Sequence, residues 1–121
     1  VTSVPMKTLD SLVREHGLAW PELIKMDIQG AELRALRGAP ECLQHAEFVQ
    51  TEFSLLPVQK DIPLLDDLVV CLSQHGFRIF NVYGVCGRPL DGMPVQGEIL
   101  FVKKQSPLIT DMRWSETSNW S

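Results

Sequence analysis

The apolar positions of this chain follow two alternating periods. Some segments carry apolar residues every three or four positions, as at Leu65, Leu68, Val69 and Leu72, and this spacing is typical of helices. Other apolar runs are too short for a helix and are rich in strand-forming residues, which indicates buried strands. The pattern predicts helices over 8–16, 31–37, 40–43 and 63–75, and strands over 23–28, 47–53, 77–83 and 98–103.

Turn-forming residues set the bounds of these elements. Thr8 is suited to cap the first helix, because its hydroxyl can accept a backbone N–H, and Gly17 follows the end of that helix. Segment 84–97 contains four glycines and two prolines, and this density of turn residues predicts a loop. We expect residues 1–104 to form one domain and the polar segment 105–121 to be a tail.

The order of the elements indicates an α/β fold. Helices alternate with the first three strands, which is the pattern of a parallel sheet with helical crossovers. No helix separates 77–83 from 98–103, so these last two strands are expected to pair as an antiparallel hairpin. We therefore predict a mixed sheet that is parallel at one side and antiparallel at the other.

Composition narrows the classes of function. Of the 121 residues, 45% are hydrophobic and 21% are charged, as in an ordinary globular domain. The net charge of −4 argues against nucleic acid as a partner. No apolar run approaches the roughly 20 residues that cross a bilayer, and no signal peptide is apparent, so we expect no membrane partner. The three cysteines form no C-x-x-C pair, so we expect no disulfides and a cytoplasmic location. The histidines do not have the spacing of metal ligands, so we expect no metal site.

Three motifs in fixed order and spacing are similar to those of one enzyme family. They are Thr8-Leu9-Asp10, then K-M-D-I-Q-G-A-E over 25–32, then Leu36-Arg37-Gly38-Ala39. In these motifs the chain resembles the FkbM methyltransferases, where the pattern is T-L-D, K-I-D-V-E-G-x-E and L-x-G-A. Glu52, Gly76-Phe77 and 100–102 extend the resemblance to roughly residues 3–104.

The resemblance implies the C-terminal half of a class I methyltransferase domain with a Rossmann-like sheet. Its four strands would be the fourth to seventh of that sheet, laid out 4-5-7-6. The cofactor would be S-adenosylmethionine, and the acceptor a small molecule with a hydroxyl group on a sugar or natural-product scaffold. The glycine-rich loop that approaches the cofactor in this family has no counterpart in these 121 residues. The chain alone is therefore not expected to complete the cofactor site.

Candidate site residues follow two of the predicted strands. Asp27 and Glu52 stand at strand ends, where open α/β sheets bind ligands, so we expect their carboxylates to share one edge and assign both as catalytic. Glu52 is the candidate base for proton transfer. The resemblance places Asp27 at the cofactor rim, and we assign Gln29, Gly30 and Glu32 to the same rim. Gln29 stands where the family often has glutamate, so it keeps a hydrogen-bond acceptor without the charge.

Each of these residues also has a structural interpretation. Asp27 can cap the following helix, and Gly30 can serve only the tight turn between strand and helix. Glu32 can complement the positive end of the helix dipole, and Glu52 can be a solvated strand end. The residue types alone do not decide between these interpretations and a role in a site.

Two other functions compete with the methyltransferase. A half-sheet exposes the edge of strand 23–28, and unpaired edges pair readily, so we expect a homo-oligomer through that edge. The alternative function is accordingly a non-catalytic self-association module. An unrelated α/β enzyme is disfavoured, because the chain contains neither a G-x-S-x-G nucleophile turn nor a G-x-x-x-x-G-K-[ST] phosphate loop.

Overall fold

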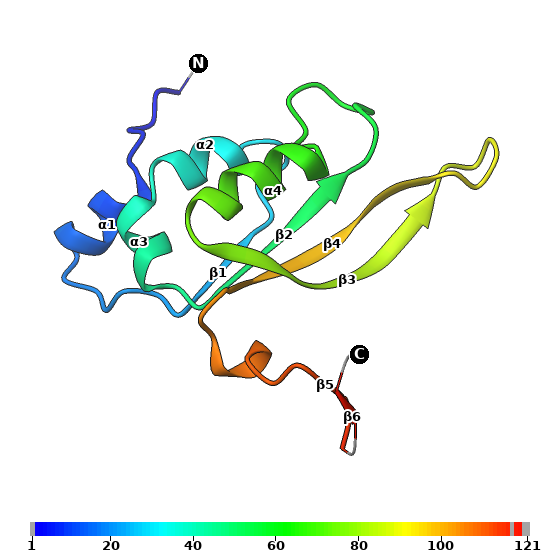
Figure 1. Cartoon of the computed structure of the whole chain (residues 1–121). Helices are drawn as coiled ribbons and strands as arrows, with labels where there is room; N and C mark the ends of the chain where they lie inside the picture. Colours follow the sequence, from blue (N-terminus) through cyan, green and yellow to red (C-terminus); the bar gives the residue numbers. More distant parts are fainter. Residues whose placement is uncertain (1, 117, 120–121) are drawn as a thin grey trace.

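This computed structural model describes residues 2–116 and 118–119 of the chain. A mixed four-stranded sheet forms the centre of its main body (Figure 1). Four α-helices and four strands make up its main body. They are α1 (Leu9–Glu15), β1 (Leu23–Met26), α2 (Glu32–Arg37), α3 (Pro40–His45), β2 (Phe48–Ser54), α4 (Leu65–Gln74), β3 (Phe77–Gly87) and β4 (Pro94–Lys103). Within the described residues, no helix is long and apolar enough to span a membrane.

The strands lie in the order β1-β2-β4-β3. β1 and β2 are parallel, with Leu23 opposite Phe48 and Met26 opposite Thr51. β4 lies between β2 and β3 and is antiparallel to both. The predicted α/β class, the parallel pairing of the first two strands and the antiparallel hairpin are therefore confirmed. The fourth strand lies between the second and the third.

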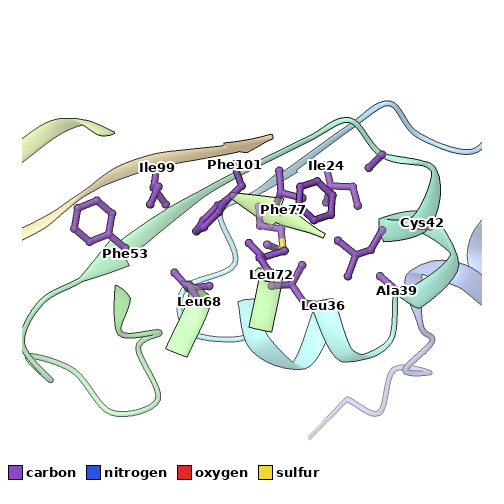
Figure 2. Packing of buried hydrophobic residues seen from close by; sticks show 14 of the residues in the cluster. Ile24, Leu36, Ala39, Cys42, Phe53, Leu68, Leu72, Phe77, Ile99 and Phe101 are labelled. Carbon is purple, nitrogen blue, oxygen red and sulfur yellow. The ribbon is translucent and has the colours of Figure 1, made fainter. Parts of the chain in front are cut away.

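The hydrophobic core lies between the sheet and the four α-helices, which cover one face of it (Figure 1). Along β2 the residues alternate: Val49, Thr51 and Phe53 are buried, whereas Phe48, Gln50 and Glu52 are half-buried on the opposite face. Figure 2 shows how strand and helix side chains meet. The labelled members of this cluster are Ile24, Leu36, Ala39, Cys42, Phe53, Leu68, Leu72, Phe77, Ile99 and Phe101.

The predicted loop over 84–97 is wrong. β3 continues to Gly87 and β4 begins at Pro94, so only residues 88–93 connect them. The pairing register shifts between Tyr83 and Cys86, and Gly84 in this bulge has a φ of +60°. A bulge uses glycine to bend a strand without ending it. The turn residues that predict a loop therefore serve here inside a long, bent hairpin, which extends far beyond the helices (Figure 1).

The segment after β4 contains short elements that the sequence pattern does not predict. They are the 3-10 helix η1 (Pro107–Ile109) and the two-stranded pair β5 (Arg113–Ser115) and β6 (Ser118–Asn119). The hydroxyl of Ser106 donates to Oε1 of Glu47 at 2.6 Å, which ties the start of this segment to the sheet. Positions 117, 120 and 121 of the predicted tail lie outside the described residues.

A buried carboxylate joins α1 to α3. Thr8 caps α1 as predicted, because its hydroxyl oxygen accepts the backbone N–H of Ser11 at 3.1 Å. The side chain of Asp10 instead accepts the backbone N–H groups of Glu41 at 2.8 Å and Cys42 at 2.9 Å. Burial raises the pKa of Asp10, but these backbone donors outweigh burial and hold the pKa below its ordinary value of 3.8.

We predict that Asp10→Ala lowers the free energy of unfolding by about 2–3 kcal/mol near neutral pH, because one buried and one partly buried N–H group lose a charged acceptor. Since the folded-state pKa of Asp10 is lowered, this stabilisation is present above its ordinary pKa and is lost as the pH falls through the folded-state value. Urea unfolding at neutral and acid pH measures both effects. The control is Asp67→Ala at an exposed site of α4, and an equal loss in this control would contradict the assignment.

Candidate functional site

Two of the predicted site residues, Asp27 and Glu52, lie at the same carboxyl edge of the parallel strands. Because β1 and β2 run in the same direction, their carboxyl ends lie at one edge of the sheet. Met26 is paired with Thr51, so the residues that follow them, Asp27 and Glu52, stand level with each other. β3 runs in the same direction as β2, because both are antiparallel to β4, and the hairpin therefore extends from this edge.

Glu52 lies in a region of negative charge. Its side chain is half-buried, and burial is the largest cause that raises its pKa above the ordinary value of 4.5. The charges of Asp27, Glu98 and Glu32 raise the pKa of Glu52 further. Glu98 is the direct cross-strand partner of Glu52 in the pairing of β2 with β4. A carboxyl group with a raised pKa is better suited to accept a proton than an ordinary one.

Glu98 is a site residue that the sequence analysis does not identify. It lies inside a predicted strand, and no motif distinguishes it from its neighbours. Only the register of β4 against β2 places it opposite Glu52, and the register of β4 against β3 places it opposite Tyr83. The hydroxyl of Tyr83 in turn accepts the side-chain N–H of Gln50 at 2.6 Å, so polar groups from three strands lie together on this face.

A small polar cavity of about 190 Å³ opens beside Glu52. It lies between the loop that joins β1 to α2 and the segment that precedes α4. Its lining consists of Gln29, Gly30, Glu32, Glu52, Gln59, Ile62, Pro63 and Gln96. Pockets that enclose a drug-sized ligand have volumes of about 300–1,000 Å³. This cavity is therefore large enough for only one part of such a ligand.

The loop after β1 places its polar residues in different environments. Asp27 is exposed, and its Oδ1 accepts the side-chain N–H of Gln29 at 2.9 Å. Ala31 is the N-cap residue of α2, and no side chain caps this helix. The interpretation of Asp27 as a helix cap is therefore wrong, and its carboxylate stays at the rim.

Gly30 and Glu32 hold the shape of this loop. Gly30 has a φ of +106°, and a Cβ atom there would lie 3.0 Å from the backbone oxygen of Asp61, so glycine permits two loops to touch. Glu32 is only 1% exposed, and its oxygens accept the backbone N–H groups of Ile28 at 3.2 Å and Gly30 at 2.9 Å. Both residues border the cavity, yet their close contacts are with the protein backbone.

The described residues contain no metal centre of the usual kind. Within residues 2–116 and 118–119, no group of three or more His, Cys, Asp or Glu side chains is placed to hold a metal ion. The groups present at this edge are carboxylates and amides beside a polar cavity, which can attract a positive charge, form hydrogen bonds and accept a proton.

Open α/β sheets bind their ligands beyond the carboxyl ends of parallel strands, and this sheet places two carboxylates there. Comparison with known families is more specific, because the model of the FkbM methyltransferase domain matches residues 1–79. This segment is more than half of the chain and includes both Asp27 and Glu52. The chain belongs to the FkbM methyltransferase family.

One characterised relative gives a more particular likeness. The chain is 42% identical over 52 residues to the 2-O-methyltransferase NoeI of Sinorhizobium fredii (strain NBRC 101917 / NGR234). The matched segment is 43% of this chain but 21% of that protein, so the alignment covers about a fifth of the relative's length. No solved structure matches the chain.

We predict that Glu98→Gln lowers the pKa of Glu52, because it removes one of the negative charges that face this carboxyl group. Burial, Asp27 and Glu32 still act in the variant, so the pKa should remain above its ordinary value. Titration of the side-chain carboxyl carbons by ¹³C NMR measures the change. Glu22→Gln, at an exposed position before β1, is the matched control. An unchanged titration of Glu52 in the Glu98 variant would show that the two carboxylates do not interact.

Proposed function

We propose that this chain is the C-terminal half of a class I methyltransferase domain that uses S-adenosylmethionine to methylate a hydroxyl group of a small molecule, such as a sugar. Membership of the FkbM family supports methyl transfer as the reaction. The name of the relative, a 2-O-methyltransferase, supports a hydroxyl acceptor. The observation that carries the proposal is the placement of Asp27 and Glu52 at one edge, inside the segment that matches the family.

The strand order supports the assignment to half of a larger sheet. The order β1-β2-β4-β3 corresponds to strands 4-5-7-6 of a class I methyltransferase, with the antiparallel strand in the place of the seventh. In that arrangement the free edge of β1 faces the strands that carry the glycine-rich loop. The small size of the cavity beside Glu52 agrees with a site of which this chain supplies one wall.

The residues at the edge fit the part of the cofactor that carries positive charge. S-adenosylmethionine, when bound, supplies a methyl group on a cationic sulfur. Asp27, with Gln29 and Gly30 beside it, would hold that end of the cofactor, because an exposed carboxylate attracts a cation. Glu52, whose pKa is raised, would take the proton that the acceptor hydroxyl loses. Glu32 would shape the loop from beneath, since its oxygens already accept backbone N–H groups.

Titration of the ¹⁵N-labelled chain with S-adenosylmethionine tests this proposal. We predict millimolar binding, with chemical-shift changes at residues 27–32 and 52, because one wall of the site supplies only part of the binding energy. Asp27→Asn should abolish these changes, whereas Asp67→Asn, at an exposed site of α4, should preserve them. No shift at residues 27–32 would contradict the placement of the cofactor. Micromolar binding would contradict the need for a second half.

A second proposal concerns the isolated chain, which we infer pairs with a second copy of itself through β1. Within the described residues β1 pairs only with β2, so its other edge keeps free backbone N–H and C=O groups. A trough of about 880 Å³ runs along this edge between α1 and α2. Its wall is largely apolar and includes Leu9, Leu12, Leu18, Ile28, Ala31 and Ala35. A second copy can pair with the backbone groups of the β1 edge and also cover the apolar wall of the trough. Water can form hydrogen bonds with those backbone groups but does not remove the apolar wall from solvent.

Light scattering coupled to size-exclusion chromatography measures this association. We predict a dimer at micromolar concentration, and an increase of at least about tenfold in its dissociation constant for Leu12→Lys, because the substitution puts a charge into the apolar wall. Val70→Lys, on the exposed side of α4, is the matched control and should leave the dimer intact. A monodisperse monomer of the unmodified chain would contradict the pairing and would leave the methyltransferase proposal unaffected.

A further inference from the structure

The loop between β1 and α2 has an unusual backbone. Gln29 and Gly30 both have positive φ angles, +54° and +106°. A positive φ is unfavourable for a residue with a Cβ atom, and at Gln29 it is therefore maintained by the surroundings. The short helix that follows gives little help, because its N-cap residue is Ala31 and no side chain caps it.

Glu32 supplies the contacts that hold this backbone. One of its carboxylate oxygens accepts the N–H of Ile28 and the other accepts the N–H of Gly30. These two donors lie on either side of Gln29, so a single carboxylate fixes both ends of the left-handed residue. Burial of a charge is costly unless hydrogen bonds compensate it, and here the loop backbone provides that compensation. Side chain and loop therefore stabilise each other.

The side chain of Gln29 transmits this geometry to Asp27. Its Nε2 donates to Oδ1 of Asp27 at 2.9 Å, and the same side chain borders the polar cavity. The direction in which a side chain leaves the backbone is set by φ and ψ, so the left-handed conformation decides where the amide group of Gln29 lies. A continuous series of contacts thus joins the buried carboxylate of Glu32 to the exposed carboxylate of Asp27.

We propose that Glu32 is a positioning residue for Asp27, acting through the backbone of residues 28–30 and the side-chain amide of Gln29. Glutamine is essential to this arrangement, because its amide donates a hydrogen bond that a glutamate of equal shape cannot donate. What Asp27 then binds rests on the proposed function. The coupling between Glu32 and Asp27 does not, and it is measurable without any ligand.

NMR spectroscopy of the ligand-free chain tests the coupling. In Glu32→Gln, one oxygen is replaced by an NH₂ group that cannot accept the backbone N–H. We expect whichever of the Ile28 and Gly30 amide hydrogens loses its acceptor to exchange at least about tenfold faster, relative to the core amide of Val49. The side-chain NH₂ signals of Gln29 and the carboxyl-carbon signal of Asp27 should shift as well. If the amides lose protection and the Asp27 signal does not move, Glu32 supports the loop only and the proposal is wrong.

The isosteric variant Gln29→Glu separates the two steps and serves if the Glu32 variant fails to fold. It leaves both hydrogen bonds to Glu32 in place and replaces the donor to Asp27 by a carboxylate. We expect Ile28 and Gly30 to remain protected while the carboxyl signal of Asp27 shifts. Gln44→Glu, at an exposed site of α3, is the matched control and should leave that signal unchanged. An unmoved Asp27 signal in Gln29→Glu would overturn the proposal, whether or not the chain binds S-adenosylmethionine.

Discussion

The candidate site depends on the parallel pairing of β1 with β2. Asp27 lies just beyond the end of β1 and Glu52 lies near the end of β2, and the pairing of Met26 with Thr51 brings the two level with each other. A shift of this register by one residue would turn the side chains of one strand to the other face. The buried alternation of β2 against the helices prevents such a shift, because Val49 and Phe53 belong to the core. Packing on one face of the sheet thus determines where the carboxylates lie at its edge.

The acidic residues of the core and of the candidate site lie in two kinds of environment. Asp10 and Glu32 are buried, and each accepts two backbone N–H groups that fix the path of the chain. Glu52 instead lies opposite Glu98 and near Asp27, where like charges oppose one another and raise its pKa. The first arrangement stabilises the fold, and the second is unfavourable for it. An edge that concentrates negative charge in this way is suited to a cationic ligand or to proton transfer.

Within the described residues, one edge of β1 has no strand partner. The trough beside β1 is apolar and far larger than the polar cavity beside Glu52, and the two lie on different sides of the loop that carries Asp27. Glu32 accepts two backbone N–H groups of this loop, and by our proposal these contacts keep Asp27 at a defined place.

The sequence alone determined the secondary structure of the main body and the family. The period of the apolar residues predicted each helix and strand, and the order of the motifs predicted the FkbM family. Both signals come from residues that are close together along the chain. Local pattern failed over 84–97, since glycine marks a bulge as readily as a loop. It also could not place Glu98 opposite Glu52, or bury Glu32 beneath its own loop. Those positions follow from strand register and from the competition of buried groups for hydrogen-bond partners, which only the tertiary structure decides.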